Sequence, residues 1–278
     1  MARVRLDAYA LLKRVKAVSP VVHHVTNWVT IYDCANVVKV LGASPVMAHA
    51  REEVAHMTDL AQALVLNIGT LTVDLVESMK IAARAANRKG IPVVLDVCGA
   101  GATDFSDQKS FELLDAARID IVKGNASEIA RLSGEDVKTK GVDAVEVEAS
   151  LLDLAKDLAL ERGCTVVITG PEDVVTDGGS TYLIKNGHPM MGQVVGTGCM
   201  AASVIGTFAA VEPDLAFAAA SGLVCFEVAA ECAVQACFGP GSFKECLYDY
   251  LYHLDKETID RLQQVERCEA IISSRMPA

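Results

Sequence analysis

The chain contains 278 residues, of which 51% are hydrophobic, and its formal net charge at pH 7 is −11. Such a chain can bury a full core in one large α/β domain or in two small ones. The acidic balance and the lack of a Lys/Arg cluster argue against a nucleic-acid surface and against a patch for anionic membranes. Catalysis on a small molecule and binding to a protein partner remain as possible functions.

Residues 1–16 alternate basic and apolar side chains at helical spacing and contain no unbroken hydrophobic segment, so we expect no signal peptide. Short apolar runs rich in β-branched residues then alternate with helix-length segments. This alternation is typical of βαβ units around a mostly parallel sheet. The expected strands are Val21–Val25, Ala63–Leu66, Val93–Asp96, Ile119–Val122 and Thr165–Thr169.

Amphipathic helices are expected between these strands, for example over Thr72–Ala86 and Ala144–Arg162. A glycine follows each of them closely, at Gly90 and Gly163. Glycine commonly ends a helix because it adopts the left-handed conformation without strain.

The pattern changes after the last of these strands. Two short runs, Val174–Asp177 and Thr181–Ile184, flank a Gly-Gly-Ser turn and predict an antiparallel hairpin at the edge of the sheet. The last third of the chain is mainly helical, with a predicted capping box from Ser242 to Glu245 ahead of a helix over Cys246–Leu254. No repeat or linker interrupts the chain, so we expect one domain over residues 1–278.

Nine cysteines, an odd number without a CxxC pair, are scattered through apolar segments. Reduced thiols in a cytoplasmic protein explain this distribution best. The longest uncharged stretch, Asn186–Val211, is interrupted by Gly, Pro, His and Gln. The next apolar run starts only after Glu212-Pro213-Asp214, so a pair of buried helices fits better than a membrane span.

The most informative stretch is Gly196-Thr197-Gly198-Cys199, directly ahead of an uncharged, Ala-rich run that predicts a buried helix over Met200–Val211. A glycine-flanked turn that opens a helix aims unpaired backbone N–H groups at one point, which attracts anions. The helix dipole favours a thiolate at Cys199 in the first turn. Taken alone, however, Cys199 is more simply a small packed side chain.

Polar groups also follow the predicted parallel strands, where the sheet edge of an α/β fold gathers its ligands. Asp96 and Glu128 suit a Mg²⁺ ion that keeps most of its waters, and Lys123 could neutralise phosphate charge. Together with the Gly196–Cys199 turn, these residues indicate phosphoryl transfer. Each has a simpler alternative: Asn125 and Glu128 also form an ordinary capping box.

Two further pairs of residues indicate a functional role less clearly. His23 and His24 end the first strand and point to opposite faces, so a structural or pocket role fits better than a shared metal ion. Trp28 and Tyr32 could line an apolar pocket, but core packing is the default for both.

Eight ordered blocks between about residues 20 and 210 resemble the hydroxyethylthiazole kinase family. The blocks are His23-His-Val-Thr-Asn27 with Asn36, Gly42-Ala-Ser-Pro-Val-Met47, Leu66-Asn-Ile-Gly-Thr70, Pro92-Val-Val-Leu-Asp96, Gly124-Asn-Ala-Ser-Glu128, Ile168-Thr-Gly170, Asn186-Gly-His-Pro189 and Gly196-Thr-Gly-Cys199. The resemblance implies a ribokinase-like α/β fold, a three-layer sandwich with helices on both faces of the sheet. It also implies a homotrimer with active sites between subunits.

The resemblance further implies ATP- and Mg²⁺-dependent phosphorylation of the primary alcohol of 4-methyl-5-(2-hydroxyethyl)thiazole. Its implied site residues are Met47 and Gly196 for the thiazole, with Asn27, Gly69 and Thr70 completing the pocket; Lys123, Thr169 and Asn125 for ATP; Thr197 and Gly198 for the anion hole; Asp96 and Glu128 for the metal and its waters; and Cys199 where related sugar kinases usually carry an aspartate base.

The chain departs from the family pattern at two places. Lys123 replaces the more usual Arg, and a lysine lacks the bidentate fork of that side chain. The turn after Asp96 reads Val97-Cys98-Gly-Ala, where Pro-Val-Gly-Val or Pro-Val-Gly-Ala is more usual. These departures concern nucleotide binding more than the reacting groups.

Three alternatives remain open at this point. The chain could phosphorylate another small alcohol, such as a hydroxymethylpyrimidine or a sugar, or it could be a non-catalytic ligand-binding protein of the same fold. A hydrolase with Cys199 as nucleophile would need a nearby base, and His188 is the only neighbouring histidine in the sequence.

Overall fold

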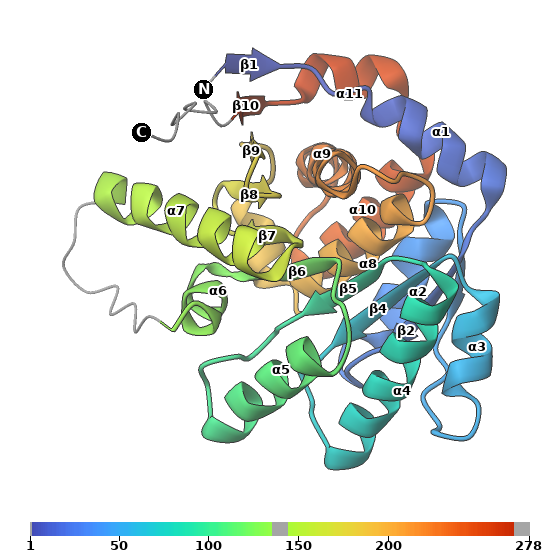
Figure 1. Cartoon of the computed structure of the whole chain (residues 1–278). Helices are drawn as coiled ribbons and strands as arrows, with labels where there is room; N and C mark the ends of the chain where they lie inside the picture. The colour runs from blue at the N-terminus through green and yellow to red at the C-terminus, as the bar shows by residue number, and fades with distance from the viewer. Residues whose placement is uncertain (1, 135–143, 270–278) are drawn as a thin grey trace.

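A single ten-stranded sheet, in the order β1-β10-β9-β8-β7-β6-β5-β4-β2-β3, organises the computed structural model, which describes residues 2–134 and 144–269 (Figure 1). The strands from β3 to β7 in this order run parallel, and the others add antiparallel pairs. The bounds are β1 Ala2–Val4, β2 Val21–Val25, β3 Ser44–Val46, β4 Ala63–Asn67, β5 Val93–Asp96, β6 Ile121–Asn125, β7 Thr165–Thr169, β8 Asp173–Thr176, β9 Ser180–Ile184 and β10 Val265–Glu269.

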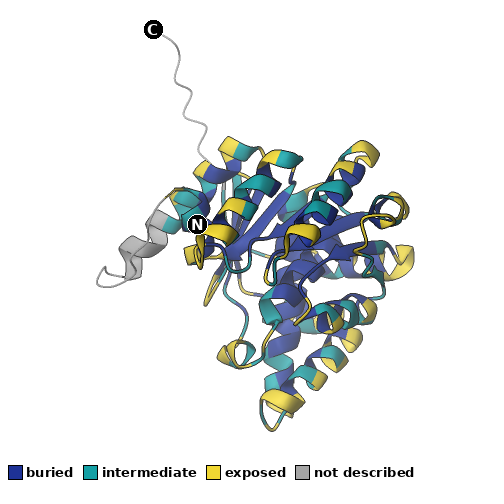
Figure 2. Ribbon diagram, turned by 90° about the horizontal axis from the view of Figure 1, so that it is seen from below, coloured by how far each residue is buried: buried dark blue, intermediate teal, exposed yellow. Residues whose placement is uncertain are grey.

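Helices cover both faces of the sheet, and the strands between them are buried (Figure 2). Helices α1, α2, α8, α9 and α10 pack on one face, and α4, α5, α6 and α7 on the other. The bounds are α1 Ala8–Val18, α2 Ile31–Val40, α3 Val54–Leu60, α4 Val73–Lys89, α5 Asp104–Ala116, α6 Ala126–Leu132, α7 Ala144–Arg162, the 3₁₀ turn η1 Pro189–Gln193, α8 Thr197–Ala209, α9 Leu215–Ala236, α10 Pro240–His253 and α11 Lys256–Leu262. The predicted fold class, with its antiparallel edge, is confirmed.

Two apolar helices form the centre of one layer. Helix α8 approaches β4 so closely that a Cβ at Gly206 would lie 2.3 Å from Cγ2 of Val65. Helix α9 is long and apolar enough to cross a membrane, but 78% of its apolar window is buried inside the protein. The apolar surface of α9 therefore packs in the hydrophobic core, as expected for one helix of a buried pair.

Strand register brings three polar side chains into one row. Asn67 at the end of β4 pairs with Asp96 of β5, and Asp96 pairs with Lys123 of β6. In a parallel sheet, paired residues at the carboxyl ends lie side by side. The row therefore stands at the edge where ligands of α/β folds bind.

Several boundaries differ from the predicted ones. Strand β6 begins at Ile121, two residues later than expected, and β1 and β10 extend the antiparallel edge at the two ends of the chain. The predicted capping box at Ser242 is wrong as a helix start, because α10 already begins at Pro240. The Ser242 hydroxyl instead accepts the backbone N–H of Gly239 at 3.2 Å from inside the first turn. Proline at the first helical position fixes φ for the helix.

Candidate active site

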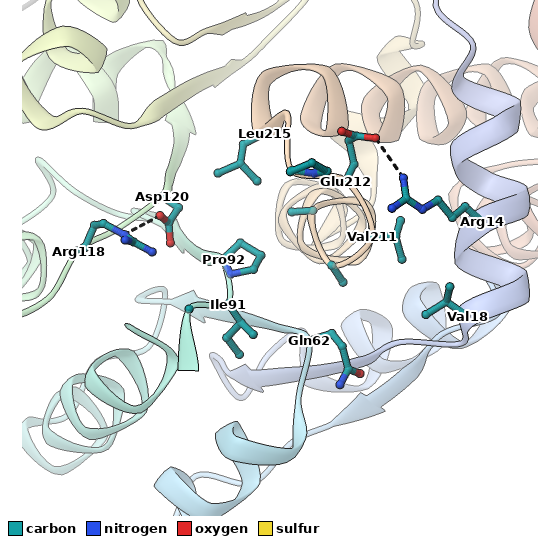
Figure 3. Close-up of a pocket in the computed structure, with 14 residues that line it drawn as sticks. Arg14, Val18, Gln62, Ile91, Pro92, Arg118, Asp120, Val211, Glu212 and Leu215 are labelled. Atoms are coloured by element: carbon teal, nitrogen blue, oxygen red, sulfur yellow. Dashed lines mark hydrogen bonds and ion pairs between the residues drawn. The ribbon is translucent and has the colours of Figure 1, made fainter. Parts of the chain in front are cut away.

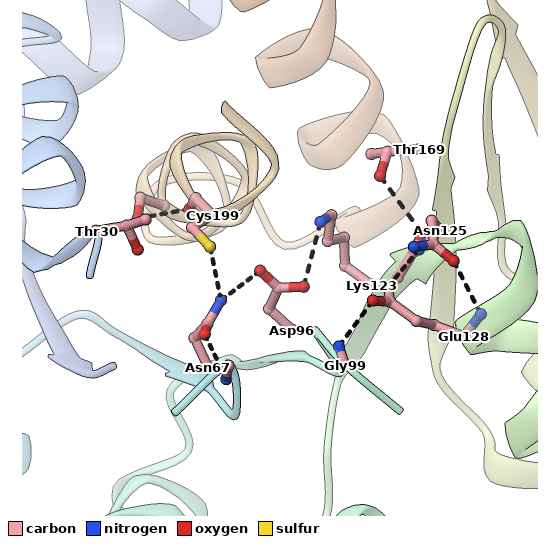
Figure 4. Close-up of polar contacts among 12 residues, drawn as sticks. Thr30, Asn67, Asp96, Gly99, Lys123, Asn125, Glu128, Thr169 and Cys199 are labelled. Carbon is pink, nitrogen blue, oxygen red and sulfur yellow. Dashed lines mark hydrogen bonds and ion pairs between the residues drawn. The ribbon is translucent and has the colours of Figure 1, made fainter. Parts of the chain in front are cut away.

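The side chain of Asn67 joins the end of the parallel sheet to the start of α8 (Figure 4). Its Nδ2 donates to Oδ2 of Asp96 at 2.6 Å and contacts Sγ of Cys199 at 3.3 Å. Asn27 donates to Oδ1 of Asn67 at 2.7 Å and also contacts Cys199 Sγ, at 3.4 Å. Segments that lie far apart in the sequence thus meet at one thiol.

Lys123 stands on the other side of Asp96. Its Nζ donates to Oδ1 of Asp96 at 3.2 Å, and both side chains are buried. A Cβ at Gly198 would lie 3.3 Å from this Nζ, so the ammonium group sits against the first turn of α8. A buried cation and the positive end of a helix dipole therefore lie at one place, and both attract an anion there.

Burial raises the pKa of Asp96 to about 7, although the Lys123 ammonium opposes the shift; the Cys199 and Glu128 groups add to it. Burial lowers the pKa of Lys123, but the neighbouring carboxylates Asp96 and Glu128 outweigh it and the net shift is upward. The carboxyl group of Asp96 therefore binds a proton more tightly than that of an ordinary aspartate, while the ammonium group of Lys123 stays charged.

Glu128 and Asn125 form the predicted capping box at the start of α6. The Asn125 Oδ1 accepts the N–H of Glu128 at 2.9 Å, and Glu128 Oε2 accepts the N–H of Asn125 at 2.7 Å. Glu128 Oε1 also accepts the N–H of Gly99 at 2.8 Å, which ties the glycine-rich turn after β5 to this helix. The interpretation of Asn125 and Glu128 as a capping box is thus confirmed. The carboxylate of Glu128 still places a negative charge at the site.

The predicted Gly-Thr-Gly-Cys turn opens α8. Gly196 has φ of +98° and precedes the first helical residue, and a Cβ there would lie 2.6 Å from Cγ2 of Thr30. Only glycine fits this left-handed, crowded position. The free N–H groups of the first turn, including those of Thr197 and Gly198, point out of the helix start, which is the geometry of an anion site.

A cavity of about 670 Å³ lies against this helix start. It brings together the predicted ATP residues Asn125 and Thr169 with the predicted anion-hole residues Thr197 and Gly198. The Thr169 hydroxyl donates to the Gly124 carbonyl at 3.5 Å. Gly198, which lines the cavity, also lies against the Lys123 ammonium group.

Cys199 is almost fully buried, and its sulfur has several donors around it. The Cys98 thiol is the largest influence that lowers the pKa of Cys199, to about 5; burial opposes the shift, and Thr30, Lys123 and Asn27 contribute to it. The thiolate form is therefore favoured at neutral pH, as expected for a nucleophilic or basic cysteine at a helix start.

We expect the Cys199 thiolate to be present down to about pH 5. Ultraviolet absorbance of thiolate, measured as the difference between the wild type and Cys199→Ser, should rise with pH through a midpoint near this value. An ordinary cysteine titrates near about 8.5. In Cys98→Ala, which lacks the neighbouring thiol, the midpoint should move upward. A wild-type midpoint at the ordinary value would contradict this account of the site.

The predicted thiazole residues divide into two groups. Asn27 lies in the polar cluster, and Gly69 adjoins it, since a Cβ there would lie 3.3 Å from Nδ2 of Asn27. Thr70 accepts the N–H of Trp28 at 3.1 Å. Met47 directly follows β3 and is partly buried, and in the described residues no side-chain hydrogen bond links it to the cluster.

The two histidines have structural partners. His23 contacts Oγ1 of Thr58 at 2.9 Å and the Ala48 carbonyl at 2.7 Å, and burial lowers its pKa. Burial also lowers the pKa of His24, to about 3. The expectation of core packing for Trp28 and Tyr32 is wrong, because both lie exposed at the start of α2.

Sequence reasoning did not include Asn67, Thr30 or Cys98 among the site residues. Asn67 directly follows the predicted strand Ala63–Leu66, and that position could have identified it. No local pattern points to Thr30 or Cys98, because their neighbour Cys199 is distant in the sequence.

A second cavity, of about 570 Å³, opens at the opposite end of the sheet (Figure 3). Its charged side chains already have partners: Arg14 contacts Glu212 at 3.4 Å, and Arg118 contacts Asp120 at 2.8 Å. It lies at the amino ends of the parallel strands, where α/β enzymes do not bind their substrates.

A helix start beside a buried lysine and two carboxylates, at the carboxyl edge of a parallel sheet, is the arrangement expected of a phosphoryl-transfer enzyme. A ribokinase-like superfamily protein from Enterococcus faecalis shares this fold, with a TM-score of 0.61 at 16% identity over 84% of this chain and 86% of that one. The chain belongs to the hydroxyethylthiazole kinase family, whose model matches residues 12–257.

Relatives in this family match almost the whole chain. A hydroxyethylthiazole kinase from Methanosarcina mazei is 52% identical over 92% of this chain and 98% of its own length. The structure of a hydroxyethylthiazole kinase protein from Pyrococcus horikoshii superposes with a TM-score of 0.88 at 42% identity, covering 95% of this chain and 99% of that one. The protein is therefore a kinase.

Proposed function

We propose that this kinase transfers the γ-phosphoryl group of ATP to the primary hydroxyl of 4-methyl-5-(2-hydroxyethyl)thiazole, giving the thiazole phosphate for thiamine biosynthesis or salvage. One observation carries the proposal: the row Asn67–Asp96–Lys123 meets the first turn of α8 at the Cys199 thiol. Family membership supports the choice of substrate.

The chemistry follows from positioning and charge. Phosphoryl transfer has a loose transition state, so the enzyme chiefly aligns the alcohol and stabilises charge on the phosphoryl oxygens. The N–H groups of the first turn of α8 and the Lys123 ammonium supply that stabilisation. The Cys199 thiolate, held by Asn27 and Asn67, accepts the proton of the alcohol.

The donor set fits a magnesium ion that is bound through water. Among the residues that the structure describes, no group of three or more His, Cys, Asp or Glu side chains could form a cage for a metal. Asp96 and Glu128 face the same site but are held by Lys123 and by backbone N–H groups. Mg²⁺ is usually held by one or two carboxylates together with phosphate oxygens and water. When bound, it would neutralise charge on the β- and γ-phosphates.

Glu128→Gln tests this arrangement. We expect the Mg²⁺ concentration for half-maximal activity to rise several-fold, because the substitution removes one of two charges that attract the hydrated ion. The amide can still accept a backbone N–H, so the capping of α6 should largely survive. Magnesium titrations of the steady-state rate measure the effect, with the exposed Glu245→Gln as the matched control. An unchanged curve for Glu128→Gln would refute the assignment.

We further propose a homotrimer with the active site between subunits. Exposed apolar side chains surround the mouth of the site: Tyr32 and Val195 are each 73% exposed, and Val29 is 65% exposed. The contact between Thr30 and the Gly196 position brings these segments together. Contiguous exposed apolar patches commonly mark protein interfaces.

Light scattering coupled to size exclusion tests the assembly. We expect three chains per particle for the wild type, and smaller particles with reduced activity for Tyr32→Asp combined with Val195→Asp. Phe238→Asp changes an exposed aromatic residue elsewhere and is the matched control. A monomeric wild type that is fully active would contradict the proposal.

An ATP-coupled assay with the candidate alcohols tests the function itself. The thiazole alcohol should be preferred over hydroxymethylpyrimidine and sugars, with the phosphate monoester detected as product. If only another alcohol is phosphorylated, that alcohol is the substrate and the thiazole assignment is wrong. If no alcohol is phosphorylated, the result favours a ligand-binding protein of the same fold.

We also propose a cytoplasmic location, which the free state of all nine cysteines fits.

A further inference from the structure

A buried carboxyl group lies in the wall of the cavity at the start of α8, and the proposed mechanism does not use it. It belongs to Glu227 of α9, which lines this cavity together with Thr197 and Gly198. Glu227 is only 5% exposed, and within residues 2–134 and 144–269 its Oε2 has no hydrogen-bond partner. Buried polar atoms in proteins nearly always have a partner, so this unpaired oxygen points to a ligand that supplies one.

The surroundings of this carboxyl group suit a flat organic ring. Pro171, Pro189 and Phe226 line the same cavity, and no lysine or arginine is among its described lining residues. The segment before η1 lies directly against the carboxyl group, because a Cβ at Gly187 would be 3.7 Å from Cδ of Glu227. Apolar walls with a few placed polar groups are typical of sites that bind small organic molecules.

The carboxyl group of Glu227 favours its uncharged form. Burial raises the pKa of Glu227 well above its usual range, and the charge of Asp173, which lines the same cavity, adds to the shift. A protonated carboxyl group has one O–H donor and keeps an acceptor oxygen. Adenine presents the complementary groups on one edge, an amino group that donates beside a ring nitrogen that accepts. A metal ion fits less well, because it requires a deprotonated carboxylate.

We propose that Glu227 recognises the adenine base of ATP, with its carboxyl group accepting a hydrogen bond from the 6-amino group of the base. This rests on the proposed function, which makes ATP the phosphoryl donor. Glu227 shares its cavity with the predicted ATP residues Asn125 and Thr169. The Lys123 ammonium lies against Gly198, so the phosphates are attracted to the helix start and the uncharged base is left for Glu227.

This contact makes Glu227 a residue that determines nucleotide specificity. A site that hydrogen-bonds one group of a ligand rejects an analogue without that group, because a buried polar atom is then left unpaired. Purine riboside 5′-triphosphate differs from ATP only in lacking the 6-amino group. We expect the wild type to bind ATP about tenfold more tightly than this analogue, the scale of one buried hydrogen bond.

Isothermal titration calorimetry of the complete enzyme, with Mg²⁺ and without any alcohol, measures both affinities. Glu227→Met is similar in size but removes both oxygens, so ATP should bind about tenfold more weakly while the affinity for the analogue changes little. Glu227→Gln keeps an acceptor oxygen beside a donor and can pair with adenine in the same way, so its preference for ATP should survive. Ser221→Ala is the matched control, because it removes another unpaired buried oxygen from α9 that does not line the cavity.

Equal binding of ATP and the analogue by the wild type, or an unchanged preference for ATP in Glu227→Met, would overturn the proposal. The ratio of the two affinities does not depend on the fraction of folded protein, so a merely structural role of Glu227 would leave it unchanged. The titrations contain no alcohol. A wild type that prefers ATP but does not phosphorylate the thiazole alcohol would therefore contradict the proposed substrate and support the contact with the base.

Discussion

Asp96→Asn is expected to lower the free energy of unfolding by about 3 kcal/mol, because it leaves the buried Lys123 ammonium without its principal counter-charge. Activity should fall as well, since the amide cannot act in the charge network around the phosphates. Urea unfolding and steady-state kinetics measure the two effects separately.

The double variant Asp96→Asn with Lys123→Met distinguishes stability from catalysis. Replacing both charges with uncharged groups of similar size can be nearly neutral for stability. We therefore expect the double variant to recover much of the lost stability but none of the activity. Equal stability of Asp96→Asn and wild type would show that the ion pair is not the buried contact described here.

Cys199→Ala is expected to lower kcat by about 100-fold while the KM for ATP changes little, because the loss concerns proton transfer and leaves the phosphate contacts in place. Some activity should remain, since positioning and charge stabilisation do not depend on the thiol. Cys199→Asp should retain function, because a carboxylate can accept the same proton.

Cys164→Ala provides the matched control, since Cys164 is a buried cysteine at the start of β7 and far from the reacting groups in the fold. It should keep the wild-type kcat. A Cys199→Ala variant with the wild-type kcat would show that the enzyme needs no base at this position, and the assignment would be wrong.

Most of the parallel part of the sheet was predicted from the sequence, because strands such as β4 and β5 consist mainly of short apolar runs between turn signals. The short parallel strand β3 was not predicted. The strands at the antiparallel edge of the sheet were harder to predict. Strand β1 covers only Ala2–Val4, and it exists because β10, at the other end of the chain, pairs with it. A three-residue strand carries too little local pattern to be recognised before its partner is known.

In the candidate site, too, some residues could be predicted from local patterns and others could not. The ends of predicted strands indicated Asp96 and Lys123, since parallel topology places such residues at one edge. Neither Asn67 as the bridge nor Cys98 as the neighbour of Cys199 could be derived, because contacts between distant segments depend on register and on the path of a turn. Trp28 was expected in the core, and its exposure follows from its place at the mouth of the site, before α2.

The most direct test is a crystal structure with the thiazole alcohol and a non-hydrolysable ATP analogue. The account predicts the alcohol oxygen within hydrogen-bonding distance of Cys199 Sγ, and the γ-phosphate against the N–H groups of residues 197–199 and Lys123. An alcohol or nucleotide bound instead in the cavity beside Arg118 and Glu212, at the other end of the sheet, would contradict it.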